Sequence, residues 1–230
     1  DEESFTEIVS PEDLAIASAA ALSFAPMFRR ESGGGTPRVA VAVDTRPTGP
    51  AVADVICRCL IPEGIDVSYL FISPAPEIMA YVKTSEELHG FIYISASHNP
   101  VGHNGLKFGL SDGAVAGGEK SAAAIEAFKA FLSGDKPVER VRKAVTDGSG
   151  DLYRRVLEET TNRKVEAVKA YEEFNACVAA GTEDPEKQAL FFTELRRGAH
   201  RHPLGVLAEL NGSARTRTID GALFSKMGIS

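Results

Sequence analysis

Three short apolar runs, separated by segments of helical character, do most to limit the folds open to this chain of 230 residues. The runs are RVAVAVD (38–44), DVSYLFI (66–72) and GFIYISA (90–96). Each is rich in β-branched or aromatic residues and lies between Gly, Pro or polar residues, which is typical of buried strands. The chain therefore predicts strands that alternate with helices through short connections, the pattern of an α/β domain.

Helical segments precede and separate these runs. Residues 10–28 begin with Ser10 as a candidate N-cap, Pro11 at the first helical position and Asp13 closing a capping box. Further helices are predicted within 48–64, 77–88 and 117–134. The expected fold is α/β, a three-layer domain with a mixed sheet between helices.

The second half of the chain has a different character. Residues 135–151 are polar and rich in turn formers, residues 151–181 are strongly helical, and Pro185 begins a helix predicted to run to about Arg197. The basic segment RGAHRHP then ends that helix.

The last residues predict a strand at 204–210 (LGVLAEL) and a helix at 218–228. One strand and one helix cannot bury a core of their own, so they indicate the incomplete start of a second α/β domain. We expect a first domain at 1–140, a helical linker at 141–202 and the incomplete domain at 203–230.

The composition excludes several classes of protein. A content of 43% hydrophobic and 25% charged residues is that of an ordinary globular protein. The net charge of −7 disfavours nonspecific binding to nucleic acid or to an anionic membrane. No apolar run approaches the roughly 20 residues that span a bilayer, and the acidic residues 1–9 lack the layout of a signal peptide. Cys57, Cys59 and Cys177 cannot all pair, which suits reduced thiols and a cytoplasmic protein.

The third apolar run leads into a loop of concentrated polar chemistry, YISASHNPVGHNGLKFG (93–109). Asp44, Thr45 and Arg46 lie at the C-terminal end of the first run, and residues 95–98 lie at that of the third. Ligands of open α/β sheets gather at the carboxyl ends of the strands. We therefore expect both segments to lie at a functional edge of the sheet.

The segment SASHNPVGHNGLK (95–107) resembles the phosphoserine loop of the α-D-phosphohexomutases, the phosphoglucomutase/phosphomannomutase superfamily. The family pattern is Thr-Ala-Ser-His-Asn-Pro, followed by Asn-Gly-x-Lys. Ser95 replaces the usual threonine, and the matching residues are Ala96, Ser97, His98, Asn99, Pro100, Asn104, Gly105 and Lys107. VDTRPTGP (43–50) is also similar to the family, and PLGVLAELNGSA (203–214) loosely resembles the start of its second domain.

The resemblance implies an isomerase that moves a phosphoryl group between the 1- and 6-positions of a hexose phosphate through a phosphoserine and a hexose 1,6-bisphosphate. By resemblance, Ser97 would be the phosphoserine, Lys107 an acid/base or phosphate-side group, and His98 a phosphate or proton partner. Arg46, Asn99 and Asn104 are candidate substrate or phosphate contacts. Mg²⁺ would bind Ser97 through its phosphate, with the remaining ligands outside this chain.

The chemistry of these residue types agrees with the resemblance. Serine is a weak nucleophile at neutral pH and is better kept as a resting phosphoester. A phosphoserine carries about −1.5 to −2 charges at pH 7, so it needs the donors and cations that turn amides, His98 and Lys107 can supply. A lysine whose pKa is lowered by burial and a neighbouring cation can also exchange protons with a sugar hydroxyl.

Each candidate has a second interpretation. Ser97 could be a turn serine, Lys107 a solvated charge on an edge strand, and Arg46 a cap of the Asp44 turn through a salt bridge. His98 and His103 could bind a metal, although no carboxylate supports them. DGSGD (147–151) resembles the family's metal loop but lacks its terminal arginine, so we interpret it as a flexible boundary.

The resemblance covers the first of the family's four domains and the opening of the second. We therefore expect the N-terminal part of a longer enzyme, inactive alone, whose partners are a hexose phosphate and the remaining domains. One alternative is a natural short homologue, a non-catalytic phosphosugar-binding or partner-docking module. Another is a serine hydrolase using Ser97 and His98, against which the absence of a Gly-x-Ser-x-Gly motif argues.

Overall fold

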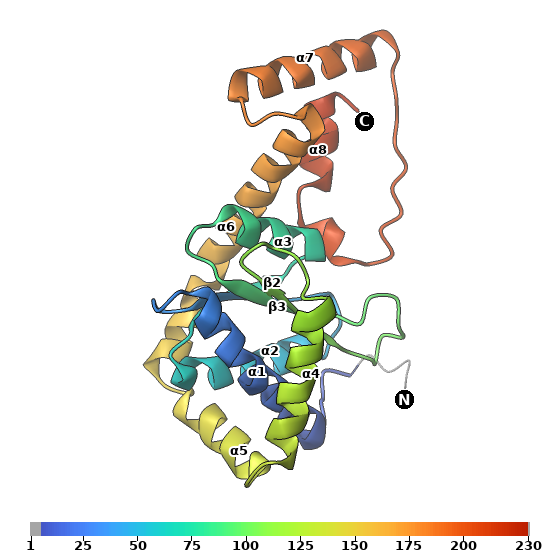
Figure 1. Cartoon of the computed structure of the whole chain (residues 1–230). Coiled ribbons are helices and arrows are strands. Elements are labelled where there is room, and N and C mark those ends of the chain that lie inside the picture. The colour runs from blue at the N-terminus through green and yellow to red at the C-terminus, as the bar shows by residue number, and fades with distance from the viewer. Residues whose placement is uncertain (1–5, 230) are drawn as a thin grey trace.

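The computed structural model describes residues 6–229 as an α/β layered domain extended by helices (Figure 1). The elements in chain order are α1 (Pro11–Glu31), β1 (Arg38–Val43), α2 (Gly49–Leu60), η1 (Ile61–Glu63), β2 (Asp66–Ile72), α3 (Ala75–Thr84), β3 (Gly90–Ile94), β4 (Leu106–Leu110), α4 (Gly118–Ser133), α5 (Pro137–Asp147), α6 (Asp151–Ala180), α7 (Pro185–Arg201), η2 (Ala214–Arg217) and α8 (Asp220–Met227). The three strands predicted in the first half of the chain are all present.

The sheet has four strands in the order β2-β1-β3-β4. β1 runs parallel to both β2 and β3, whereas β4 runs antiparallel to β3. The predicted mixed sheet is therefore confirmed. The antiparallel edge strand arises because only a short loop separates it from β3, and a short loop cannot make the long crossover that a parallel pair requires.

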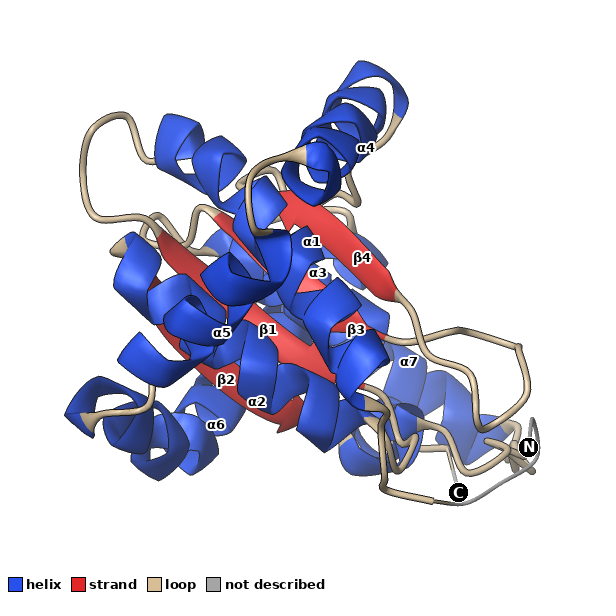
Figure 2. Ribbon diagram, turned by 90° about the horizontal axis from the view of Figure 1, so that it is seen from below, coloured by secondary structure: helices blue, strands red, loops and turns tan. Residues whose placement is uncertain are grey.

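Helices cover both faces of the sheet (Figure 2). Successive side chains of a strand point to opposite faces, and in β1 the residues Val39, Val41 and Val43 pack with α1 and α2. Ala40 and Ala42 pack on the other face with residues of α3 and α6. These strand residues are fully buried, as expected for a parallel sheet between two helical layers.

The predicted N-cap Ser10 at the start of α1 is confirmed. The Asp13 amide donates to Ser10 Oγ at 3.0 Å, and Ser10 Oγ donates to the Asp13 carboxylate at 2.7 Å. The helix then presents small residues and two phenylalanines to the sheet. Phe24 stacks on the Phe108 ring of β4 with 4.3 Å between centroids, so α1 supports the edge strand.

Three local predictions in the second half are wrong. The stretch expected to be turn-rich contains α5, because Val141 and Ala144 share one helical face and are buried, where α5 packs against α1 and α2. Helix α7 continues to Arg201 through the segment predicted to end it, since Gly198 costs a helix only about 1 kcal/mol and the first strong helix breaker is Pro203.

The strand expected at residues 204–210 is the third wrong prediction, because these residues form an extended segment outside any strand. An apolar run becomes a strand only where a neighbouring strand accepts its backbone hydrogen bonds. Leu207 is instead fully exposed. The helix predicted at 218–228 is present as α8.

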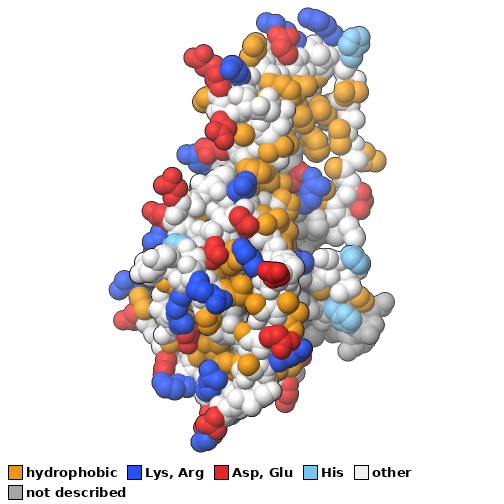
Figure 3. All heavy atoms as spheres, in the orientation of Figure 1, with side chains coloured by type: hydrophobic (Ala, Val, Ile, Leu, Met, Phe, Trp, Pro, Cys, Tyr) orange, Lys and Arg blue, Asp and Glu red, His pale blue; other side chains and the backbone are white. Residues whose placement is uncertain are grey.

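Helix α6 leads from the sheet to a part of the molecule formed by α7, α8 and the extended segment, at the top of Figure 1. At 30 residues α6 is about 45 Å long. Hydrophobic side chains gather over α7 and α8 (Figure 3), including Leu195 and Met227 beside a shallow cavity. Within residues 6–229, every helix is too short or too polar to cross a lipid bilayer.

Candidate functional site

The carboxyl edge of the sheet brings together the two loops singled out in the sequence. Val43 and Ile94 are register partners at the ends of the parallel strands β1 and β3. The Asp44 amide donates to the Ile94 carbonyl at 3.0 Å. The segments that follow, 44–46 and 95–98, therefore start side by side, and the predicted shared edge is confirmed.

Ser97 lies at the exposed tip of the turn that follows β3. Its amide donates to Ser95 Oγ at 3.1 Å, and the Asn99 amide donates to the Ala96 carbonyl at 3.1 Å. Ser97 has a left-handed backbone with φ of 56°. A residue with a Cβ pays about 1–3 kcal/mol for such a conformation, and strain of this kind clusters at functional sites.

Arg46 lies beneath this turn with a side chain that is only 10% exposed. Its Nη1 donates to the Asp44 carboxylate at 2.6 Å, which confirms the predicted salt bridge. Its Nη2 donates to two carbonyl oxygens of the loop, that of Ser97 at 3.1 Å and that of Asn99 at 2.6 Å. Its Nε is buried without a hydrogen-bond partner among residues 6–229.

Lys107 reaches the same loop from β4, where it is the register partner of Tyr93. Its Nζ donates to the Ser95 carbonyl at 3.0 Å and lies 5.5 Å from the centroid of the Tyr93 ring. Burial lowers the pKa of Lys107, the Asp44 carboxylate raises it and the Arg46 guanidinium lowers it. Lys107 is thus an edge-strand lysine whose ammonium points to the loop, with a pKa moved toward the range useful for proton transfer.

The other predicted residues divide between the loop tip and its base. His98 and Asn99 are exposed at the tip. Asn104 is half-buried at the base, where its side chain donates to Thr48 Oγ1 at 3.0 Å and accepts from the Gly105 amide at 2.9 Å. Asn104 therefore ties the end of the loop to the start of α2.

A cavity of about 460 Å³ borders the loop on the side of α1. Asn99, His103 and Asn104 contribute to its lining from the loop, and Ser10 and Thr48 from the starts of α1 and α2. Its volume lies within the range of small-molecule pockets. The predicted residues Asn99 and Asn104 thus border a space large enough for a small ligand.

Several participants escaped the sequence analysis. Ser95 supplies Oγ to the Ser97 amide and its carbonyl to Lys107. Thr48 binds Asn104, and Tyr93 faces Lys107 with a pKa raised to about 12 by burial. Ser95 was part of the segment that carries the resemblance but was given no role of its own. Tyr93 lies two residues before it near the end of β3, and the alternation of side chains along an extended chain is the signal that could have found Tyr93.

The described residues do not by themselves form a magnesium site. Among residues 6–229, no three His, Cys, Asp or Glu side chains converge to hold a metal ion, whereas Mg²⁺ prefers an octahedral set of oxygen ligands. The DGSGD segment links two helices, since Asp147 ends α5 and Asp151 begins α6. Each pairs with a basic residue of its own helix, Lys143 and Arg154 respectively.

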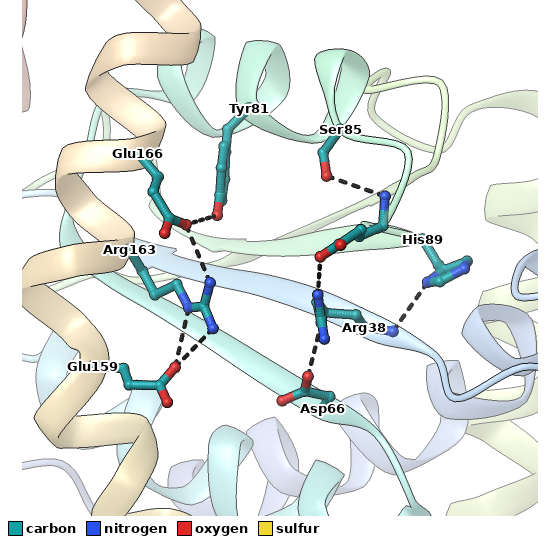
Figure 4. Close-up of polar contacts among 9 residues, drawn as sticks. Arg38, Asp66, Tyr81, Ser85, His89, Glu159, Arg163 and Glu166 are labelled. Atoms are coloured by element: carbon teal, nitrogen blue, oxygen red, sulfur yellow. Dashed lines mark hydrogen bonds and ion pairs between the residues drawn. The ribbon is translucent and has the colours of Figure 1, made fainter.

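A second polar cluster lies at the opposite edge of the sheet (Figure 4). Arg38 bridges Asp66 and Glu87, and its amide donates to His89 Nδ1 at 3.1 Å. On α6, Arg163 pairs with Glu159 and Glu166, and Glu166 accepts from the Tyr81 hydroxyl. These charges satisfy one another and join α6 to α3 and the sheet, so this cluster has a structural explanation.

Fold and loop together define an α/β domain that presents an exposed serine on a strained turn, with a lysine held against the same turn. The family model for phosphoglucomutase/phosphomannomutase, alpha/beta/alpha domain I, matches residues 7–132 of this chain. The chain therefore belongs to the phosphoglucomutase/phosphomannomutase family and contains its N-terminal region. The resemblance found in residues 95–107 is confirmed.

Several relatives share this region. Phosphoglucosamine mutase of Levilactobacillus brevis is 34% identical over 116 residues, which are 50% of this chain and 24% of that protein. Phosphoglucosamine mutase of Frankia casuarinae is 34% identical over 109 residues, 46% of this chain and 24% of that protein. Phosphoglucosamine mutase of Streptococcus uberis is 43% identical over 79 residues, 34% of this chain and 17% of that protein. The chain thus spans at most about a quarter of the length of these relatives.

Proposed function

We propose that this chain is the N-terminal part of a phosphohexomutase, an isomerase that transfers a phosphoryl group between the 1- and 6-oxygens of a hexose phosphate. The observation that supports this most is the Ser97 turn itself, exposed and strained, with Lys107 bound to the carbonyl of Ser95 two residues away. Because the three relatives are named as phosphoglucosamine mutases, glucosamine phosphate belongs among the substrates to test.

In the proposed reaction the resting state carries phosphate on Ser97. A substrate hydroxyl attacks the phosphorus and gives its proton to Lys107, and a new P–O bond forms to the sugar. The P–O bond to Ser97 Oγ breaks, and the leaving serine oxygen takes up a proton, with His98 as the second proton partner. The product of this step is a hexose 1,6-bisphosphate. Its other phosphate then returns to Ser97 Oγ, which restores the phosphoserine and leaves the isomeric hexose monophosphate.

The remaining predicted residues have supporting roles in this proposal. The neutral amine of Lys107 accepts the proton of the attacking hydroxyl. His98 is a second proton or phosphate partner, Asn99 and Asn104 are phosphate contacts, and Arg46 lies beneath the loop that carries the phosphate. Mg²⁺ bound through the Ser97 phosphate, with its other ligands outside this chain, is part of the same proposal. A cytoplasmic location also belongs to this proposal. The proposal further divides the chain into a first domain at 1–140, a linker at 141–202 and an incomplete domain at 203–230.

The test follows the phosphate. Full-length protein containing this chain is incubated with hexose 1,6-bisphosphates, and peptide mass spectrometry locates the phosphate. We expect one phosphate on Ser97, and none in the Ser97→Ala variant, which also loses mutase turnover. Phosphate on another residue contradicts the proposal. Binding of hexose phosphate without phosphorylation supports the non-catalytic phosphosugar-binding alternative instead.

A further inference from the structure

The hydrogen bonds of Arg46 differ from those that a direct contact with phosphate requires. A phosphate-binding arginine presents its donors to the ligand, usually as a planar pair of N–H groups. Here Nη1 is bound to Asp44, and Nη2 is bound to the carbonyls of Ser97 and Asn99. Nε is buried without a hydrogen-bond partner among residues 6–229. Of the other N–H groups of the guanidinium, only the second one on Nη1 lies outside these contacts, and the whole side chain is only 10% exposed.

The two carbonyls that Arg46 holds lie on either side of His98. They belong to the turn in which Ser97 has its left-handed backbone. A strained conformation persists only where its surroundings fix it, and the loop around it is exposed. Hydrogen bonds from a charged, planar guanidinium to both carbonyls are suited to fix it, because they restrain the Ser97–His98 and Asn99–Pro100 peptide groups.

Asp44 in turn fixes the guanidinium. Its two carboxylate oxygens accept from the Arg46 amide at 2.9 Å and from Nη1 at 2.6 Å. Asp44 is itself placed by the end of β1, through its amide bond to the Ile94 carbonyl of β3. A continuous series of contacts therefore runs from the paired strands through Asp44 and Arg46 to the Ser97 turn.

We infer that Arg46, oriented by Asp44, is a positioning residue that holds the Ser97 turn in the geometry from which the serine oxygen gives and receives phosphate. This inference rests on the proposed function for the role of Ser97, but the contact that it describes can be measured separately. In this role Arg46 does not bind the phosphate directly but acts on it through the turn that carries Ser97.

The experiment uses the full-length protein with Arg46→Met and Arg46→Lys. Lysine keeps the positive charge beside Asp44, but its single ammonium cannot reproduce the planar contacts to both carbonyls. The control is Arg58→Met, since Arg58 is likewise bound to a carboxylate nearby in the sequence, that of Asp54, and also joins a distant segment through Ser149 Oγ at 2.9 Å, away from the loop. Three quantities are compared: amide hydrogen exchange of residues 95–105, the rate of phosphate transfer from a hexose 1,6-bisphosphate to Ser97, and the KM for that donor.

In both Arg46 variants we expect exchange in residues 95–105 to accelerate at least about tenfold and phosphate transfer to slow at least about tenfold, with KM changed less than about twofold. Arg58→Met should leave all three within about twofold. Added guanidinium ion should restore part of the transfer rate to an Arg46→Ala variant.

Unchanged exchange in the loop of a folded Arg46→Lys protein overturns the inference. A large rise in KM with unchanged maximal rate overturns it as well, because it identifies Arg46 as a direct substrate contact. If Arg46→Met does not fold, Arg46→Lys decides. If the wild-type protein takes up no phosphate on Ser97, the proposed function fails, and the exchange result alone decides whether Arg46 holds the turn.

Discussion

Ser97 combines two properties that are separable by substitution: a reactive hydroxyl and a left-handed backbone. Glycine adopts this backbone without the penalty that a Cβ imposes, although it also gains more freedom in the unfolded chain. We expect Ser97→Gly to be at least as stable as Ser97→Ala, by up to about 1 kcal/mol in the free energy of unfolding. Both variants should lose phosphate uptake. Urea denaturation beside a phosphorylation assay checks this, and a clearly more stable alanine variant would show that the turn is not strained.

Lys107 gives a prediction about pH. Burial lowers its pKa, so a larger fraction of its amine is neutral at a given pH than in an exposed lysine. If neutral Lys107 accepts the hydroxyl proton, phosphate transfer should rise with pH and level off below pH 10.5, the ordinary pKa of lysine. Lys107→Arg keeps the charge but stays protonated, and should slow transfer by about 10²–10⁴.

The control for Lys107 is the exposed Lys129 of α4, which pairs with Glu126. Lys129→Arg should transfer phosphate at the wild-type rate, with the same dependence on pH. If Lys107→Arg retains most of its activity, then Lys107 does not act as the proton acceptor, and its charge alone is what the site uses.

At the scale of elements, a single buried carboxylate joins three parts of the chain. Glu77 of α3 is fully buried. It accepts from Lys164 Nζ of α6 and from Thr218 Oγ1, just after η2, at 2.5 Å. Lys164 also donates to Ser73 Oγ at 3.0 Å. Removal of one partner of such a pair leaves an uncompensated buried charge, which is far more costly than loss of a surface pair.

We therefore expect Lys164→Met to lower the free energy of unfolding by about 3–5 kcal/mol. Adding Glu77→Gln to this variant should recover part of the loss, because it removes the unpaired charge. Lys169→Met is the matched control, since Lys169 lies exposed on the same helix and makes only a 3.8 Å pair with Glu173; its effect should stay within about 0.5 kcal/mol. Chemical denaturation of the four proteins measures these values, and equal effects of the two lysine variants would contradict the prediction.

The elements that the sequence predicted best are those whose local pattern and tertiary role agree. β2 covers the same residues as its apolar run, 66–72. By contrast, β4 was expected only in the alternative interpretation that put Lys107 on an edge strand, because Lys107 and Gly109 interrupt its apolar pattern. It forms through non-local contacts, namely antiparallel pairing with β3 and the stacking of Phe108 on Phe24.

The candidate site was predictable in composition but not in its contacts. Residues 95–107 carried the resemblance that named the loop, and the strand-end rule placed Arg46 beside it. The partners of Arg46 and Lys107 depend on how the ends of β1, β3 and β4 come together. The sequence pattern predicts each strand, but it does not show which residues come into contact where the strand ends meet. The loop carbonyls therefore could not be recognised as the acceptors for Arg46 and Lys107.

At the scale of the whole molecule, the candidate site lies at one edge of a sheet, while α6 leads away from the domain toward α7 and α8 (Figure 1). The Ser97 turn is exposed at that edge. Phosphoryl transfer depends on cations and donors placed around the moving phosphate. In the proposed function some of these groups are supplied from outside this chain, which spans at most about a quarter of the length of the relatives that it matches.

We expect these 230 residues alone to convert hexose 1-phosphate to the 6-phosphate at least about a hundredfold more slowly than a full-length relative, because loss of even one electrostatic contact to a transition state costs 10²–10³ in rate. A coupled assay for the 6-phosphate measures this, with phosphoglucosamine mutase of Levilactobacillus brevis for comparison and Ser97→Ala of this chain as the background. A residual rate above that of the Ser97→Ala variant would depend on the Ser97 hydroxyl, and it would show that this domain alone supports slow phosphoryl transfer. A rate equal to that of the full-length relative would mean that residues 1–230 already contain every group that the reaction needs, and the proposal of a partial enzyme would then be wrong.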